Sequence, residues 1–267
     1  KNLIKNNRIY FSTGSYIYYY DVATDSYNEI IPLGNLGFNT SNVNQLTAYD
    51  LTSSNPRIMW SSEAAGAVYS VNFDGTSYMI NITDPNTYGL SLIDSTSQTG
   101  IFHELFSPEL SSKRILYSTY NEGEIIQANL DGSNSTVLYS KVSTNIYSLY
   151  MDNINNKLYW NERENSLSGV SKLMRSDINS FNEELVLNVP FNEIEDIHVL
   201  RDTNLIFFRS DRYIYNNANG SVNYIADCQG NAGGYNMCVD EINGYIYKFG
   251  SYYQTPMLYR CNLDGSN

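Results

Sequence analysis

One six-residue phrase recurs along the chain, and its spacing limits the fold more than any other feature. NFDGTS occupies residues 72–77, and NLDGSN occupies both 129–134 and 262–267. Weaker copies, SDINSFN and NANGSV, begin at residues 176 and 217. The successive starting positions are therefore 57, 47, 41 and 45 residues apart. A period of this size predicts one unit of four short strands, repeated along the chain with variable loops.

A second phrase, an apolar and aromatic strand, comes before the turns. Its six copies are RIYFSTG (8–14), RIMWSSE (57–63), RILYSTY (114–120), KLYWNER (157–163), LIFFRSD (205–211) and YIYKFGS (245–251). Asp-Gly and Asn-Gly form tight turns because glycine accepts a positive φ and the Asp or Asn side chain bonds to nearby backbone. No stretch has a sustained helical period. The sequence thus predicts an all-β, six-bladed β-propeller with four-stranded antiparallel blades.

The blades are expected at approximately 1–34, 43–83, 101–142, 145–189, 192–228 and 233–267, as a single domain. Letters A to D name the strands of each blade from the central channel outwards. Blades two to five hold four strands each, blade one holds B to D, and blade six holds A to C. Residues 1–7 supply one more strand, either A of blade one, which we favour, or D of blade six. We therefore expect the sixth blade to be completed from outside the chain, by a longer protein or a neighbouring molecule, because an open edge invites pairing.

Charge and hydropathy exclude several classes of protein. The formal net charge is −12 at pH 7, so no nucleic-acid partner is expected, because phosphate binding depends on clustered Lys and Arg. No apolar run is long enough to cross a bilayer, so no membrane insertion is expected within this segment. The three cysteines are an odd number, so at least one is free or pairs outside the chain.

The motifs resemble a known extracellular family. LYW at 158–160, followed by an Asp-containing turn, and NLDGSN after IIQA are similar to the LDL-receptor class B, or YWTD, β-propeller. The resemblance covers essentially the whole chain, although no copy keeps the full tetrapeptide and only Trp60 and Trp160 supply its Trp. It implies an extracellular or cell-surface, six-bladed, non-enzymatic module that binds a protein partner or adjoins a neighbouring domain.

Long loops indicate where a partner binds. In a propeller the D–A and B–C connections form one face, and the A–B and C–D connections form the other. The stretches 32–42, 84–100, 162–170 and 251–257 are expected as long loops of the D–A/B–C face. Its predicted contact residues are Tyr88, Glu162, Arg163, Tyr252 and Tyr253, since Tyr and Arg dominate interface hot spots. The alternative is that these loops have no binding role and reflect only the divergence of the repeat.

The residues expected in the central channel support a different hypothesis. The only histidines, His103 and His198, fall in stretches expected as innermost strands, with Glu195 near the second. An enzyme with a site at the channel mouth is the alternative that these residues leave open. No ligand spacing, nucleophile motif or phosphate loop is present, so we expect no catalytic residues, no metal and no cofactor.

Two further predictions concern the surface. Sequons mark Asn39, Asn81, Asn134 and Asn219 as glycosylation candidates, although chance alone accounts for their number. The preferred function is a protein-interaction module that uses the D–A/B–C face. A rigid structural unit of an extracellular assembly or filament is the nearest alternative, and a carbohydrate-binding propeller would need an aromatic register that we do not find in the repeats.

Overall fold

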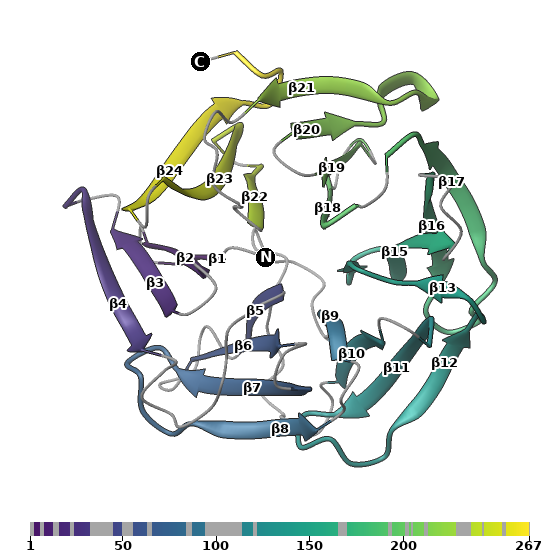
Figure 1. The fold of residues 1–267 in the computed structure, drawn as a ribbon, viewed down its shortest axis with the longest axis horizontal. Coiled ribbons are helices and arrows are strands. Elements are labelled where there is room, and N and C mark those ends of the chain that lie inside the picture. Colours follow the sequence, from purple (N-terminus) through teal and green to yellow (C-terminus); the bar gives the residue numbers. More distant parts are fainter. Residues whose placement is uncertain are drawn as a thin grey trace.

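The computed structural model describes residues 3–5, 8–12, 16–21, 24–32, 45–49, 56–62, 66–83, 87–93, 114–119, 122–164, 170–191, 194–200, 203, 205–210, 213–227, 236–241, 243–252 and 255–266. Within these ranges the chain forms six antiparallel sheets and one 3₁₀ turn, η3 (Ala218–Gly220). Figure 1 shows the sheets set around a central axis, with the first strands near the axis and the last ones on the rim. The chain is thus the six-bladed β-propeller that the repeat predicts. No helix of the described ranges has the length and apolarity to cross a membrane.

Each of the first three blades has four strands in sequence order. Blade one contains β1 (Leu3–Lys5), β2 (Arg8–Ser12), β3 (Tyr16–Asp21) and β4 (Ser26–Pro32). Blade two contains β5 (Gln45–Tyr49), β6 (Arg57–Ser62), β7 (Ala67–Asn72) and β8 (Met79–Thr83). Blade three contains β9 (Thr87–Ile93), β10 (Arg114–Thr119), β11 (Glu124–Asn129) and β12 (Thr136–Ser140).

The last three blades depart from this pattern in two places. Blade four has a split innermost strand and contains β13 (Thr144–Asn145), β14 (Leu149–Asp152), β15 (Lys157–Glu164), β16 (Ser171–Asp177) and β17 (Glu184–Val189). Blade five contains β18 (Asp196–Val199), β19 (Ile206–Ser210), β20 (Tyr213–Asn216) and β21 (Asn223–Asp227). The described part of blade six has three strands, β22 (Asn236–Asp240), β23 (Tyr245–Tyr252) and β24 (Thr255–Asn262).

The predicted start of blade three at residue 101 is wrong. Residues 87–93 form β9, which pairs along β10 as the innermost strand, so the blade begins 14 residues earlier (101 minus 87). The glycine and the run of Ser and Thr around TYGLSLI made 84–100 resemble a loop. The stretch predicted as one long loop, 84–100, therefore contains a strand of this blade.

Two other predicted loops are shorter in the structure than in the sequence interpretation. β23 and β24 pair as far as Tyr252 and Thr255, so 251–257 is a two-residue hairpin instead of a loop. β15 reaches Glu164, which reduces the B–C connection of blade four to 165–170. Among the described residues, loop length therefore no longer singles out the D–A/B–C face.

The repeated turn phrase has one hydrogen-bond pattern. The Oδ1 atom of Asp74 accepts bonds from the backbone nitrogen of Thr76 at 2.9 Å and from its hydroxyl at 2.6 Å. Asn72 donates its side-chain amide to the same hydroxyl, and Gly75 takes a φ of +82°. The turns at 129–133 and 262–266 repeat these bonds, so the sequence repeat is a repeat of local geometry.

The turn glycine also closes the seam between blades. A Cβ added to Gly75 would lie 2.9 Å from the carbonyl oxygen of Ile30, in the outermost strand of the preceding blade. Gly132 meets the carbonyl of Asn81 more closely still, and Gly265 meets that of Ile225 in the same way. Each contacted residue is the extra residue of a β-bulge, which turns its carbonyl toward the next blade. Glycine is therefore required here both for its φ and for its missing side chain.

Tyrosines close the ring between the first and the last blade. Tyr18 and Tyr20 of β3 pack against Cys238 and Tyr247 of blade six. Cys238 and Cys261 are both buried, and they lie on β22 and β24 with β23 between them, as expected for strands too far apart to bridge. Cys228 lies outside the described residues.

Candidate functional site

Strand β15 of blade four carries polar side chains to the D–A/B–C face. Alternation along the strand places Leu158 and Trp160 against the core of blade three, whereas Tyr159 packs toward blade five. Glu162 lies on the same side of the strand as Trp160, and Arg163 lies on the same side as Tyr159. Both are near the end of β15, where the B–C connection begins. The pleat thus sends two neighbouring charges to opposite sides of one blade.

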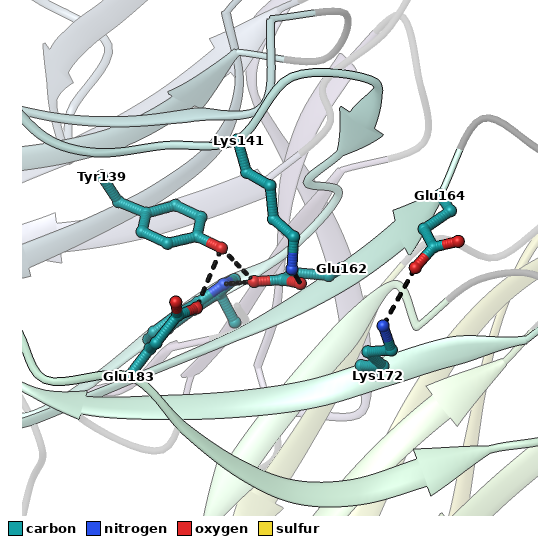
Figure 2. Close-up of polar contacts among 7 residues, drawn as sticks. Tyr139, Lys141, Glu162, Glu164, Lys172 and Glu183 are labelled. Atoms are coloured by element: carbon teal, nitrogen blue, oxygen red, sulfur yellow. Dashed lines mark hydrogen bonds and ion pairs between the residues drawn. The ribbon is translucent and has the colours of Figure 1, made fainter.

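Glu162 is a buried carboxylate with three donors. Its side chain is 2% exposed, and Lys141 donates from Nζ to Oε2 at 2.6 Å. The Tyr139 hydroxyl and Trp160 Nε1 donate to Oε1 at 2.5 and 3.1 Å, as Figure 2 shows for the tyrosine. Buried charges persist when they are paired and fully hydrogen-bonded in this way. The prediction that Glu162 contacts a partner is therefore wrong, because its oxygens are taken up inside the seam between blades three and four.

Tyr139 links this seam to the rim. Its hydroxyl lies within hydrogen-bonding distance of two carboxylates, Glu162 at 2.5 Å and Glu183 at 3.1 Å, and its ring packs on Trp160 and Phe181. Burial, and then the bond to Glu162, raise the pKa of Tyr139 well above its usual range. The hydroxyl therefore stays protonated and acts as a donor to one carboxylate at a time.

The solvent side of the same face combines charge with exposed apolar surface. Lys172 and Glu164 form an ion pair of 3.0 Å at the surface (Figure 2), where a hydrogen bond to Lys172 lowers the pKa of Glu164. Val142, in the D–A connection, is 88% exposed, and Val170, in the B–C connection, is 43% exposed. We call the surface formed by these residues the blade-four face; it consists of Lys141, Val142, Glu164, Val170 and Lys172.

Arg163 lies on the channel side of the blade-four face. It is half-buried and donates from Nη1 to the hydroxyl of Tyr147 at 2.9 Å, beside the split between β13 and β14. Of the other predicted contact residues, Tyr88 and Tyr252 lie on strands β9 and β23 instead of in loops, and their side chains are outside what the structure describes. Tyr253 lies outside the described residues.

The channel residues do not gather into one site. His198 is on β18, the innermost strand of blade five, and its Nε2 lies 3.1 Å from Oε1 of Glu241 in blade six. Glu195 instead pairs with Arg209, which also binds Asp196 at 3.0 Å. His103 lies outside the described residues. The described part of the chain contains no group of three His, Cys, Asp or Glu side chains placed to hold a metal ion.

The glycosylation candidates differ in accessibility. Asn81 is 5% exposed and donates its amide to the carbonyl of Leu130 at 2.7 Å, so a glycan on this nitrogen is incompatible with the fold and the prediction is wrong there. Asn134 and Asn219 are exposed at turns with positive φ. Asn39 lies outside the described residues.

The sequence interpretation missed Tyr139, Lys141 and Val142. The first two lie 23 and 21 residues before Glu162, on a different blade, and no local pattern links them. The burial of Glu162 had a signal: it is two residues from Trp160 in a strand and so shares its buried face.

No family model matches the chain, and no curated protein matches it. Solved structures do. A chain of a nidogen/laminin complex is similar at a TM-score of 0.58 and 11% identity, over 79% of this chain and 71% of that one. An oligogalacturonate lyase in complex with manganese gives 0.54 and 10%, over 98% and 76%. TolB from Acinetobacter baumannii gives 0.55 and 13%, over 96% and 65%.

These likenesses are at 10–13% identity and therefore show the β-propeller fold alone. One comes from a complex between two proteins and another is a lyase, so the shared fold is compatible with both binding and catalysis.

Proposed function

We propose that this chain is a non-enzymatic, extracellular protein-interaction module of the YWTD type, and that its partner binds on the blade-four face. The observation that carries the proposal is the exposure of Val142, at 88%, in a loop that begins with a lysine fixed by a buried carboxylate. Solvent-facing apolar side chains rimmed by polar ones are typical of protein contact surfaces.

The foundation of this face is rigid. Lys141 precedes Val142, and its ammonium is bound to Glu162, which is itself held by two further donors. Ser143, on the other side of Val142, takes a φ of +61°. A loop fixed at both ends loses little conformational entropy when a partner binds, and this favours affinity.

The charges of this face are paired. Lys141 and Lys172 expose 38% and 35% of their side chains, and each ammonium is bound by a glutamate. Apolar contact with Val142 is therefore expected to contribute most to binding. The nidogen/laminin likeness is compatible with a protein partner.

Site-specific photo-cross-linking tests the proposal. A photoreactive residue at Val142 is compared with one at Ile154, which is 43% exposed in the A–B connection of the same blade and so lies on the other face. Both versions of the protein are incubated with proteins from the cells that produce it. We expect one defined adduct from position 142 and none from position 154.

Charge substitutions provide the matched control. Val142→Asp should weaken capture of the adduct partner about tenfold, equivalent to about 1.4 kcal/mol, whereas Ile154→Asp should leave it unchanged. The same adduct from both positions, or equal capture by both variants, would remove the blade-four face from consideration. Adducts from position 154 alone would favour the opposite face.

A further inference from the structure

Three equivalent positions meet on the outer strands of each blade. Two lie on the third strand, two residues apart, and the last is the cross-strand partner just before the bulge of the outermost strand. In blade five these positions hold Tyr213, Tyr215 and Tyr224. The corresponding triplets in blades one to four are Tyr16, Tyr18 and Glu29; Ala67, Tyr69 and Ile80; Glu124, Ile126 and Val137; and Lys172, Met174 and Leu185.

This comparison separates fold from function. Four blades form the same strand pairs and the same bulge with non-aromatic residues at one or more of the three positions. The fold therefore does not require three tyrosines there. Among the four-stranded blades described, blade five has three aromatic rings at these positions, of which Tyr215 also packs on the core between blades four and five.

The rings of blade five form an open corner. Their centroids lie 6.1–6.3 Å apart, and their planes are inclined to one another by 58–74°. Tyr224 is 58% exposed, whereas Tyr215 is held from behind by Phe191 and Phe208, with centroids at 4.5 and 5.8 Å. The ring at the back of the corner is thus fixed, and the ring at the front is open to solvent.

The other aromatic trios of the described residues are built differently. In blade two, Trp60, Tyr69 and Tyr78 are inclined by only 22–41°, and the first two are buried. In blade four, Trp160 and Phe181 are stacked at 27°, and Tyr139 is inclined to them by 54° and 31°. Both trios therefore contain stacked rings, whereas the three rings of blade five contain no stacked pair, and two of their three pairs are inclined by more than 60°.

Distance allows one cation to meet all three rings. For a triangle with sides of 6.1–6.3 Å, the point equidistant from the corners is about 3.6 Å from each (side divided by the square root of three). A cation raised above that point stays within roughly 6 Å of every centroid, which is the range of a cation–π contact. The net charge of −12 also raises the local concentration of cations.

We propose that Tyr213, Tyr215 and Tyr224 bind a quaternary ammonium group. Such a group has no N–H to donate, so aromatic faces recognise it better than hydrogen-bond acceptors do. The chemistry is shared by free choline, by trimethylated lysine and by the headgroup of a choline lipid. This site is on the outer strands of blade five and does not depend on the blade-four face.

Ligand-observed NMR on the purified chain tests the site. Choline is titrated beside 3,3-dimethylbutan-1-ol, its neutral isostere, and we expect saturable binding of choline alone, with a Kd of about 1 mM. A trimethyl-lysine peptide and phosphatidylcholine vesicles form the next two arms, and the arm with the tightest binding identifies the source of the group.

Variants make the result specific. Tyr224→Ala should weaken choline binding about fivefold and Tyr224→Phe should restore it, because the face of the ring and not its hydroxyl makes the contact. The matched control is Tyr27→Ala, which removes another exposed tyrosine of an outermost strand, 41% exposed in β4, and should change nothing. Equal binding of the neutral isostere, equal loss in both alanine variants, or no saturation up to about 50 mM in any arm would overturn the proposal.

Discussion

The seams on the two sides of blade three are closed by different means. Between blades two and three, Gly132 lies against the backbone carbonyl of Asn81, and the Asn81 amide bonds to Leu130. Between blades three and four the turn has no glycine, and the ring of Phe181 packs on Tyr139 while Glu162 binds donors from both blades. One seam is a backbone contact and the other is built from side chains.

This difference shows how the propeller remains closed where the sequence of the repeated turn has changed. Where the Asp-Gly turn is kept, the turn glycine lies against the backbone of the preceding blade. Where the turn has changed to the SDINSFN sequence, aromatic and charged side chains make the contact between the blades instead. The buried pair between Lys141 and Glu162 is therefore part of the replacement for a lost glycine contact, and it also fixes the loop that presents Val142.

The backbone seam should be the more sensitive to a single atom. Gly132→Ala adds a methyl group that overlaps the carbonyl of Asn81, at a φ of +80°. We expect a loss of about 3 kcal/mol in the free energy of unfolding, measured by urea titration. The control is Gly244→Ala, where φ is +75° but no atom lies within 4 Å, and where about 1 kcal/mol is expected. Equal losses would mean that φ alone explains the glycine and that the seam contact is unimportant.

Removal of the carboxylate at the side-chain seam should lower the free energy of unfolding slightly less. Glu162→Ala leaves the amine of Lys141 and Nε1 of Trp160 without their acceptor, and the hydroxyl of Tyr139 keeps only its longer bond to Glu183. Since Lys141 is 38% exposed and can be hydrated again, we expect a loss of about 2–3 kcal/mol in urea unfolding. The matched control is Ser62→Ala at the equivalent position of blade two, where the buried hydroxyl has no hydrogen-bond partner and a loss below about 0.5 kcal/mol is expected.

Substitution of the two tryptophans also tests whether Glu162 stabilises the seam between blades three and four. Trp160 Nε1 donates to Glu162, whereas the buried Nε1 of Trp60 has no hydrogen-bond partner among the described residues. Trp160→Phe should therefore be about 1 kcal/mol more destabilising than Trp60→Phe, since both lose the same volume. If the two variants unfold at the same urea concentration, the carboxylate is not the centre of this seam.

Exposed carboxylates beside the seams should have the smallest effect, visible only in acid. The hydroxyl and then the backbone N–H of Ser133 lower the pKa of Asp131. A carboxylate with a lowered folded-state pKa contributes stability above its unfolded pKa, about 3.9, and this contribution is lost as the pH falls through the folded value. Asp131→Asn should thus lose less stability than wild type between about pH 6 and pH 3. An identical fall in the urea midpoint would contradict this assignment.

Much of the fold could be predicted because its signals are local. The Asp-Gly turns bond within four residues, and the aromatic strands alternate in a way that needs no neighbour. The prediction was wrong where propensity and pairing disagreed: TYGLSLI has the glycine and serines of a loop, yet the open edge of β10 pairs with it. The site was harder to predict, because the residues that bind Glu162 include Tyr139 on a strand of another blade, and no local pattern links the two.

The sequence by itself determined the unit, its repetition and its turns, because each depends on contacts within one blade. Only the tertiary structure decided which polar residues are buried and which aromatic residues are open. The burial of Asn81 and Glu162 is set by a neighbouring blade, and the corner formed by Tyr213, Tyr215 and Tyr224 depends on how two outer strands pair. These contacts join residues far apart in the chain, and burial is a property of the assembled ring.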